Sequence, residues 1–430
     1  MLQEKSAGRA AGGGNPLAAY AVVTLAYWAF MLTDGALRML VLLHFHKLGF
    51  SPIQLAYLFL GYELMGVLTN LSAGWLAARF GLTRTLYAGL TLQICALLAL
   101  AMLDPAWGVW LSVAFVMCVQ AASGAAKDLT KMSAKSAVKI LAPAEDGGLF
   151  RWVAALTGSK NAVKGLGFLL GAALLAWAGF ETAVLAMAAA LGATLAAVLF
   201  ALPPGLPAGA AKAAFRDVFS TDPNVNWLSA ARVFLFGARD VWFVVGVPIY
   251  FYSVLSDGTT EGNRAAFFMI GTFMAVWIMG YGAVQAFAPR LLGQSRGGAV
   301  VDTVRRAQGW ALGLAAIPFA LALAAWAAPG PSPALTATLV AGLILFGAVF
   351  AVNSSLHSYL ILAFTTGERV TMDVGFYYMS NAAGRLLGTL LSGVSFQLGG
   401  LPLCLATAGV MVTLSWLAAR PLGRTAAAAG

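Results

Sequence analysis

The segment LTGSKNAVKGLGFLLGAALLAW, residues 156–177, is apolar enough to lie in the hydrocarbon of a bilayer, yet it carries Lys160 and Lys164 one helical turn apart. A charged side chain at the centre of a bilayer costs about 2.5–3.5 kcal/mol on insertion scales. The two lysines therefore need water or a negatively charged partner. The segment predicts a membrane helix whose lysines face the interior of the protein rather than lipid.

The composition of the whole chain is that of a membrane protein. Of the 430 residues, 60% are hydrophobic and 10% are charged, whereas about 25% of the residues in soluble domains are charged. The net charge of +10 comes from cations scattered between apolar runs. Nucleic-acid-binding proteins instead gather such charge on a patch or an arm. We therefore expect an integral membrane protein of the lipid bilayer that binds no nucleic acid.

Twelve apolar runs are long enough to cross a hydrocarbon core of about 30 Å, which takes about 20 helical residues. They cover residues 17–47, 53–78, 83–103, 107–132, 151–178, 181–202, 225–254, 265–288, 305–328, 333–364, 370–398 and 401–420. Short links such as GFSP at 49–52 require neighbouring helices to be antiparallel. The polar segment 203–224, which contains Pro and Gly, separates two groups of six runs.

The predicted organisation follows from these runs. We expect a cytoplasmic tail at 1–16, an N-terminal six-helix bundle at 17–202, a cytoplasmic linker at 203–224, a C-terminal six-helix bundle at 225–420 and a cytoplasmic tail at 421–430. With a cytoplasmic N-terminus, sixteen flanking cations lie on the inner side and only Lys47 and Arg264 on the outer side. Cytoplasmic loops are enriched in Lys and Arg. The sequence therefore predicts a monomeric, multi-pass protein of the cell inner (plasma) membrane with both termini cytoplasmic.

Two segments, one in each predicted half, resemble each other. SKNAVKGLGFLLGAALL at 159–175 and SNAAGRLLGTLLSG at 380–393 each place a cation three or four residues after an Asn, followed by small residues near fourfold spacing. Small residues at this spacing let helices approach closely. Pseudo-repeated halves are typical of major facilitator transporters. We predict an all-α membrane protein of twelve transmembrane helices in two pseudo-symmetric six-helix halves, the major facilitator fold.

The predicted helices retain more positive than negative charge. Eight cations lie within them: Arg38, Lys127, Lys131, Lys160, Lys164, Arg232, Arg239 and Arg385. The acids at comparable depth are Asp34, Glu63, Asp128 and Asp240. Four acids cannot neutralise eight cations, so we expect a water-filled cavity that holds an anion. Arg offers a planar fork for phosphate-type oxygens and Lys a compact charge, which favours a multiply charged, phosphate-like ligand.

The predicted substrate-binding residues are these cations together with the polar side chains beside them. They are Arg38, Lys127, Lys131, Lys160, Asn161, Lys164, Arg232, Arg239, Asn353, His357, Asn381 and Arg385. Asp34, Glu63 and Asp240 are candidates for proton coupling or for ion pairs. Among them Glu63 is the preferred proton carrier, because no residue of opposite charge lies close to it in the sequence. Arg239 and Asp240 are adjacent, so we expect them to point to different faces and to pair with other helices.

Several of these residues also have a purely structural interpretation. Asp34 and Arg38 are spaced i, i+4 and can pair with each other. Lys127 and Lys131 can extend to the cytoplasmic interface while their aliphatic stems stay in the hydrocarbon. His357 can be a hydrogen-bonded interior histidine rather than a binding or proton-carrying residue.

Motifs for enzymatic or ATP-driven chemistry are missing from the sequence. It contains no GxxxxGK[ST] phosphate loop and no HExxH. The three cysteines, Cys95, Cys118 and Cys404, lie far apart, and no Cys or His cluster has the spacing of a metal site. We therefore expect no enzymatic activity, no cofactor and no metal. Transport would be driven by an ion gradient or by exchange, as in an antiporter.

Several stretches resemble the ArsJ-type organoarsenical efflux permeases of the major facilitator superfamily, over about residues 20–400. They are YWAFMLTDGALRMLVLLHFHKLGFSP, GAAKDLTKMSAKSAVK, LTGSKNAVKGLGF, LSAARVFLFGARDVWFVVGVP, HSYLILAF and GFYYMSNAAGRLLGTLLSG. The loop GWLAARFGLTR at 74–84 is similar to the superfamily signature GxLaDrxGrk, but Ala78 replaces the usual Asp, and Leu82 and Thr83 replace the basic pair. This departure weakens the expectation of the usual charged gate.

The resemblance implies export of 1-arseno-3-phosphoglycerate and, through it, resistance to arsenate. This ester forms when glyceraldehyde-3-phosphate dehydrogenase uses arsenate in place of phosphate, so that dehydrogenase is the implied functional partner. The lack of clustered cysteines fits a pentavalent oxyanion, since trivalent arsenic would call for thiolates. The alternatives are an exchanger of sugar phosphates or phosphoglycerate against phosphate and, from another class, a membrane receptor or scaffold.

Overall fold

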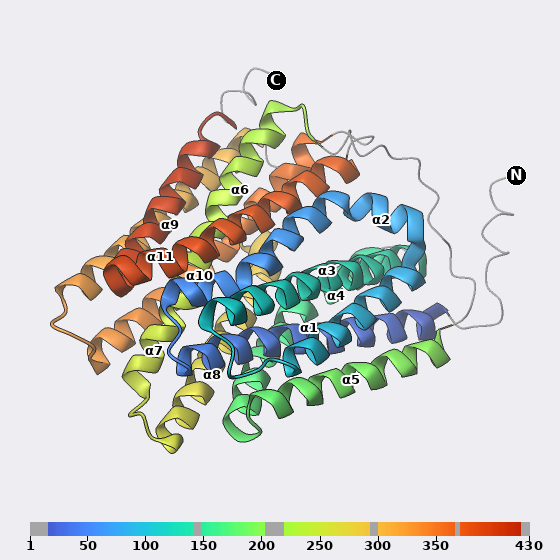
Figure 1. The fold of residues 1–430 in the computed structure, drawn as a ribbon. Coiled ribbons are helices and arrows are strands. Elements are labelled where there is room, and N and C mark those ends of the chain that lie inside the picture. The colour runs from blue at the N-terminus through green and yellow to red at the C-terminus, as the bar shows by residue number, and fades with distance from the viewer. Residues whose placement is uncertain (1–15, 142–147, 203–218, 293–299, 366–369, 423–430) are drawn as a thin grey trace, which may run out of the picture.

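The computed structural model describes residues 16–141, 148–202, 219–292, 300–365 and 370–422, and its regular elements are helices packed side by side (Figure 1). In that view the N-terminal helices, blue to green, gather on one side, and most of the C-terminal helices, up to red, gather on the other. Most of the predicted tail at 1–16, of the predicted linker at 203–224 and of the predicted tail at 421–430 lies outside the described residues.

The helices follow the predicted runs. The N-terminal helices are α1 (Pro16–Lys47), α2 (Pro52–Ala101), α3 (Val109–Leu141), α4 (Gly148–Trp177) and α5 (Phe180–Ala201). The C-terminal helices are α6 (Pro223–Val241), the π-helical turn η2 (Trp242–Gly246), α7 (Val247–Leu255), α8 (Thr260–Leu291), α9 (Val300–Ala327), α10 (Pro333–Phe364) and α11 (Val370–Ala419). Every predicted run coincides with a helical segment, because α2 and α11 each cover two runs.

Both of these long helices are interrupted at glycine. In α2 the break is Gly81, with φ 71° and ψ 173°. In α11 it is Gly399 and Gly400, and Gly400 has φ 61°. Only glycine adopts positive φ at little cost. The breaks lie between the predicted runs, so each long helix consists of two helical segments joined by a kink.

Helix starts are fixed by side-chain caps. Ser51 and Gln54 form a reciprocal capping box at the start of α2. The Asp222 carboxylate accepts a hydrogen bond from the Asn224 backbone N–H at 2.7 Å, and the Ser332 hydroxyl accepts one from the Leu335 N–H at 3.1 Å. Such caps satisfy backbone donors that the first turn of a helix leaves free. A proline follows each of these caps, in the helix position that tolerates it.

The run predicted as one helix at 225–254 is not uniform, because the π-helical turn η2 separates α6 from α7. Pro248 follows this turn and has no backbone N–H to donate, which locally disrupts the α-helical ladder. The Ser392 hydroxyl of α11 accepts hydrogen bonds from the backbone N–H groups of Val245 at 3.1 Å and Gly246 at 3.3 Å. A contact with another helix therefore satisfies donors at this irregular turn.

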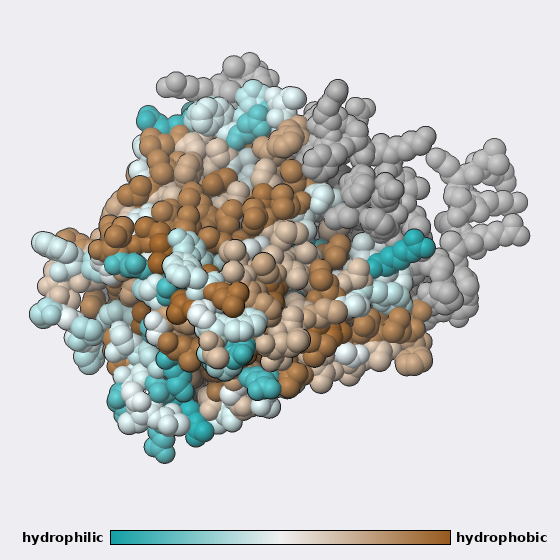
Figure 2. All heavy atoms as spheres, viewed as in Figure 1, coloured by the Kyte–Doolittle hydropathy of each residue, from teal (hydrophilic) through white to brown (hydrophobic). Residues whose placement is uncertain are grey.

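The outer surface is that of a protein embedded in lipid. Ten helical stretches in the described ranges are long and apolar enough to cross a membrane. Large apolar side chains project outward, such as Phe200 at 91% exposure and Trp326 at 76%. Figure 2 shows a broad hydrophobic belt on one face, with hydrophilic residues gathered toward its ends. The chain is therefore an all-α protein with multiple membrane-spanning helices.

Glycines among the small residues that follow Lys164 and Arg385 lie in close helix–helix contacts. A Cβ atom added at Gly171 of α4 would lie 2.1 Å from the Ala36 carbonyl oxygen of α1. A Cβ atom added at Gly388 of α11 would lie 2.4 Å from the Gly237 carbonyl oxygen of α6. These contacts bring the charged middle of α1 against α4, and that of α6 against α11.

Candidate functional site

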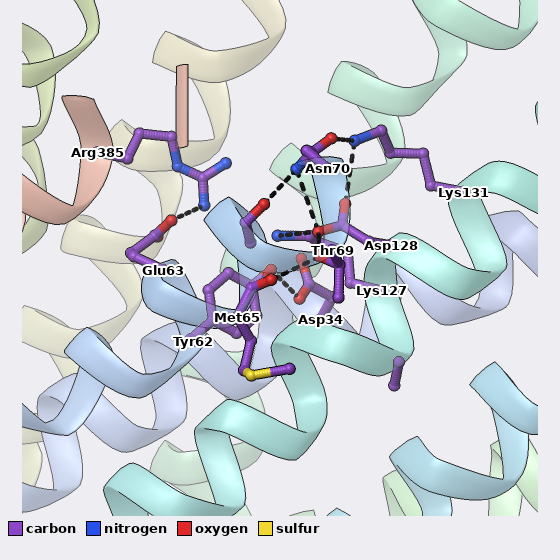
Figure 3. A network of polar contacts seen from close by, with 12 residues as sticks. Asp34, Tyr62, Glu63, Met65, Thr69, Asn70, Lys127, Asp128, Lys131 and Arg385 are labelled. Carbon is purple, nitrogen blue, oxygen red and sulfur yellow. Dashed lines mark hydrogen bonds and ion pairs between the residues drawn. The ribbon is translucent and has the colours of Figure 1, made fainter. Parts of the chain in front are cut away.

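The centre of the site is the carboxylate of Glu63 on α2, which lies between two guanidinium groups. Its Oε1 is 2.5 Å from Nη2 of Arg38 on α1. Its Oε2 accepts a hydrogen bond from Nη2 of Arg385 on α11, and Figure 3 shows this second contact. The Glu63 side chain is fully buried. This single acid therefore ties α1 and α2 to α11.

The ion pairs continue into α6 through the same arginine. Nε of Arg385 is 3.8 Å from Oδ2 of Asp240, and Oδ1 of Asp240 is 2.5 Å from Nη2 of Arg239. The resulting ion-pair chain, defined as Arg38, Glu63, Arg385, Asp240 and Arg239, contains three cations and two acids. The ion-pair chain therefore carries one net positive charge, although each of its cations contacts a carboxylate.

A second pair joins α1 to α4. Nζ of Lys164 is 3.2 Å from Oδ2 of Asp34, whose Oδ1 accepts a hydrogen bond from the Tyr62 hydroxyl at 2.5 Å. Lys160 lies one turn before Lys164 and is partly buried. Asn161 packs against Gly282 of α8, since a Cβ atom added at Gly282 would lie 2.7 Å from the Cβ atom of Asn161. The α4 residues predicted to bind substrate therefore contact both α1 and α8.

A third group surrounds Asp128 on α3. Its carboxylate accepts hydrogen bonds from Nζ of Lys131 at 3.0 Å, from the Thr69 hydroxyl at 2.6 Å and from the Asn70 amide at 3.3 Å (Figure 3). Nζ of Lys127 is 4.0 Å from the same carboxylate and 4.1 Å from the centroid of the Tyr62 ring. Two lysines thus share one acid, and Lys127 is only 7% exposed. Lys127 is therefore buried among these contacts. It does not extend to the cytoplasmic interface, which was the alternative to a binding role.

The remaining described arginine of the predicted set, Arg232 on α6, is held by neutral groups. Its Nε donates to Oδ1 of Asn381 at 2.6 Å, and its Nη1 donates to the carbonyl of Ser354 at 2.9 Å. Its guanidinium carbon lies 4.2 Å from the ring centroid of Phe236 and 4.8 Å from that of Tyr377. Cation–π contacts of this kind orient a guanidinium without neutralising it.

Asn353 and His357, one turn apart on α10, are buried without hydrogen bonds at some of their polar atoms. They are 0% and 1% exposed. Both amide atoms of Asn353 and Nδ1 of His357 have no hydrogen-bond partner among the described residues. The interpretation of His357 as a fully hydrogen-bonded interior residue is therefore not supported at Nδ1.

Two expectations about the charges need correction. Arg38 does not take Asp34 as its partner but pairs with Glu63, while Asp34 pairs with Lys164. Arg239 and Asp240 contact each other directly, although consecutive helical residues start on different faces. The long Arg side chain can turn back toward its neighbour, and Asp240 reaches Arg385 with its second oxygen.

Of the two roles predicted for Glu63, the structure shows ion pairing, since its carboxylate lies between two arginines. A proton added to this carboxylate would leave Arg38 without its carboxylate and Arg385 with only the 3.8 Å contact to Asp240, which is costly in a buried position. Likewise, Lys164 contacts Asp34 where an open cavity was expected. In this conformation the central cations are held by acids, so an incoming anion must compete with them.

The neutral members of the network were not predicted from the sequence. Tyr62, Thr69 and Asn70 donate hydrogen bonds to buried acids, and the Ser354 carbonyl accepts one from Arg232. Uncharged polar residues are common in membrane helices and carry no distinctive cost. The only sequence signal for these residues was their position on the helix of Glu63. Tyr62 directly precedes Glu63, and Asn70 lies two turns after it.

A cavity of about 260 Å³ lies at another place in the fold. Its lining includes Lys47 at the end of α1, Trp177 at the end of α4 and Arg264 near the start of α8. These are the helix ends predicted to face the outer side of the membrane. The cavity therefore does not include the ion-pair chain.

This arrangement of helices, with the charged middle of the bundle buried between α1, α2, α6 and α11, is the predicted major facilitator fold and is shared with solved structures of membrane transporters. The nucleoside transporter NupG superposes with a TM-score of 0.67 at 15% identity, covering 94% of this chain and 98% of that one. A mutant of the peptide transporter POT in complex with sulfate gives a TM-score of 0.70 at 14% identity, over 94% of this chain and 95% of that one. A POT family transporter in complex with 5-aminolevulinic acid gives 0.68 at 14% identity, over 93% and 94%.

These likenesses define the fold, while the identities are too low to carry over a substrate. No protein-family profile and no curated protein sequence matches the chain.

Proposed function

We propose that the protein is a secondary transporter of the major facilitator type that exports an anionic phosphate-type ester. The observation that carries the proposal is the excess of buried positive charge over buried negative charge. The ion-pair chain has three cations for two acids, and Asp128 serves two lysines. Intramembrane charges are costly and typically line the path of a substrate or ion. A polyanionic passenger supplies the missing negative charge.

The ligand would compete with the protein's own carboxylates. Arg38 and Arg385 share Glu63, and Lys164 has Asp34, so each of these cations can exchange a side-chain carboxylate for a ligand oxygen. Such an exchange costs less than freeing a bare charge, because the cation remains paired throughout. Breaking the contact of Glu63 with Arg385 would also release α2 from α11. Ligand binding and movement of the helices would then be linked, as alternating access requires.

For the particular substrate we propose 1-arseno-3-phosphoglycerate. The support is the resemblance of six sequence stretches to organoarsenical efflux permeases, together with cations on α1, α4, α6 and α11 that suit a ligand with an anionic group at each end. Glyceraldehyde-3-phosphate dehydrogenase would supply this ester in the cytoplasm. The direction, export, is what this resemblance implies, and the proposed location is the cell inner membrane with both termini cytoplasmic.

The test is transport into everted membrane vesicles, in which export appears as uptake. Vesicles receive arsenate, glyceraldehyde-3-phosphate, NAD and the dehydrogenase, and the arsenic that accumulates is measured. We expect accumulation with the full mixture and background values when the dehydrogenase is left out. Arsenic uptake that persists without the dehydrogenase would contradict the proposed substrate.

Two variants connect the result to the site. Lys164→Gln and Arg385→Gln should each lower uptake by at least about tenfold, since each removes a buried charge–charge contact. Arg305→Gln is the control, because the Arg305 side chain is 76% exposed and its pairing with Asp302 spans 3.9 Å. Exchange of labelled 3-phosphoglycerate against phosphate, without arsenic uptake, would identify the exchanger instead. Partner binding without either form of transport would point to a receptor or scaffold.

A further inference from the structure

Arg232 differs from the other buried cations in lacking a negatively charged partner. Arg38, Lys127, Lys131, Lys164, Arg239 and Arg385 each have a carboxylate within ion-pair distance. Arg232 is 3% exposed and makes its hydrogen bonds to an amide oxygen and a backbone carbonyl. Among the described residues no carboxylate pairs with it. A buried, permanently charged group in this state is costly unless an anion joins it.

The helix opposite Arg232 presents polar atoms that lack partners. Phe236 of α6 and Phe350 of α10 have ring centroids 5.3 Å apart, which fixes the antiparallel register of the two helices. One turn further, Arg232 bonds the carbonyl of Ser354. Asn353 and His357 continue the α10 face that Phe350 begins, at the helical spacing of three and four residues. They therefore lie along the same α6–α10 seam as Arg232.

The unsatisfied atoms of this seam suit an oxyanion. The possible donors among them are Nδ2 of Asn353, Nδ1 of His357 and the hydroxyl of Ser229, which lies one turn before Arg232 on α6. Ser229 is 3% exposed, so it too is buried. An amide N–H, a hydroxyl and an imidazole nitrogen can each donate a hydrogen bond to an anionic oxygen. The guanidinium has further N–H groups besides the two already bonded.

We propose that Arg232, with Ser229, Asn353 and His357, forms an anion subsite between α6 and α10 that binds one phosphate-type oxyanion. The subsite deepens the proposed function, on which it rests for its role in transport: it takes one charged end of the ester, while the cations of the ion-pair chain take the other. Phe236 and Tyr377 hold the guanidinium between them, so its direction is set before the anion arrives. Inorganic phosphate and the phosphate end of an organic ester share the chemistry that this subsite recognises.

The experiment measures thermal stabilisation of the purified, detergent-solubilised protein by inorganic phosphate and, separately, by 3-phosphoglycerate, with chloride at equal ionic strength as the reference. In wild-type protein we expect the melting temperature to rise with either anion. In Arg232→Gln the anion concentration needed for half of that rise should increase at least about tenfold, the usual effect of losing a charge-assisted hydrogen bond. Tighter binding of 3-phosphoglycerate than of phosphate would assign the subsite to the organic ester. Equal binding would assign it to free phosphate.

Asn353→Leu keeps the proposal testable if Arg232→Gln fails to fold. It removes two unpartnered buried atoms, so without anion its melting temperature should equal or exceed that of the wild type, while its half-saturating anion concentration should rise about tenfold. A purely structural role of Asn353 predicts the opposite, a lower melting temperature with the anion response intact. Arg305→Gln, at an exposed position, should match the wild type in both respects.

The outcomes separate the subsite from the proposed function. A wild-type protein that neither anion stabilises, or Arg232→Gln and Asn353→Leu variants that respond as the wild type does, overturns the subsite even if vesicles accumulate arsenic. Conversely, an anion response that depends on Arg232 and Asn353 supports the subsite even if the coupled vesicle assay shows no arsenic uptake.

Discussion

The contact of α1 with α4 and the contact of α6 with α11 share a plan and differ in where their cations are held. In both, a glycine on the second helix lies against a backbone carbonyl of the first, at Gly171 and at Gly388. In both, an acid on the first helix faces a cation on the second. Lys164 lies 3.2 Å from Asp34. Arg385 lies 3.8 Å from Asp240 and hydrogen-bonds Glu63 of α2.

The difference teaches that, of the two cations Lys164 and Arg385, only Arg385 also pairs with an acid outside its own helix–helix contact. A lysine ammonium is a single point of charge, whereas the planar guanidinium presents several donors to different partners at once. Arg385 can therefore serve Asp240 on α6 and Glu63 on α2 together. Through it the α6–α11 contact responds to events at α1 and α2, and the α1–α4 contact has no equivalent link through Lys164 among the described ion pairs.

The largest effect should come from removing the carboxylate that makes this link. Glu63→Gln leaves Arg38 and Arg385 without their shared acid, and breaking a buried ion pair from one side costs about 3–5 kcal/mol. Urea or thermal unfolding in detergent should show this loss, together with loss of vesicle uptake. Glu261→Gln is the control, because Glu261 is exposed in the first turn of α8. A Glu63→Gln protein as stable as the wild type would contradict the bridging role.

An intermediate effect should come from the glycines, and it should be similar in both contacts. Gly171→Ala and Gly388→Ala each place a methyl group against a carbonyl oxygen, so the helices must separate, at a cost of about 1–3 kcal/mol. The melting temperatures of the two variants measure it. Gly309→Ala is the matched control, since a Cβ there meets nothing within 4 Å. Tolerance of alanine at one site but not at the other would break the parallel between the two contacts.

The smallest effect should come from replacing Arg385 by Lys and Lys164 by Arg. This pair of variants distinguishes best between the two helix–helix contacts. Arg385→Lys keeps the charge but cannot serve Glu63 and Asp240 together, so uptake should fall about tenfold, equivalent to about 1.4 kcal/mol. Lys164→Arg keeps a charge that needs one partner and should change uptake less than threefold, within about 0.7 kcal/mol. Equal losses in the two variants would show that bridging by the guanidinium has no special role.

The fold could be predicted from the sequence because hydrocarbon leaves few choices. Runs of about 20 apolar residues must be helical in a bilayer, and short links make neighbours antiparallel. Even the breaks at Gly81 and Gly400 lie in the predicted links. The π-helical turn could not be foreseen, since it depends on the contact of Ser392 with the backbone of Val245 and Gly246 as well as on Pro248.

The members of the candidate site were easier to predict than their partners. A buried charge such as Lys164 or Arg385 stands out in an apolar run because its cost is large. Which acid each cation takes depends on distances between helices far apart in sequence, so the pairing of Arg38 with Glu63 rather than with Asp34 had no sequence signal. Neutral donors such as Tyr62 could not be predicted, because a neutral side chain in an apolar run does not carry the cost of a buried charge.

The turn at Trp242–Gly246 changes which face the residues after it present. A π-type turn closes its hydrogen bond one residue later than an α-helical turn, so it holds one residue more. Positions after the turn are therefore offset by one from those of a continuous α-helix that begins with α6. Deleting one residue from this turn would rotate α7 by about 100° relative to Arg232 and Arg239 of α6, carrying Tyr250 to a different neighbour.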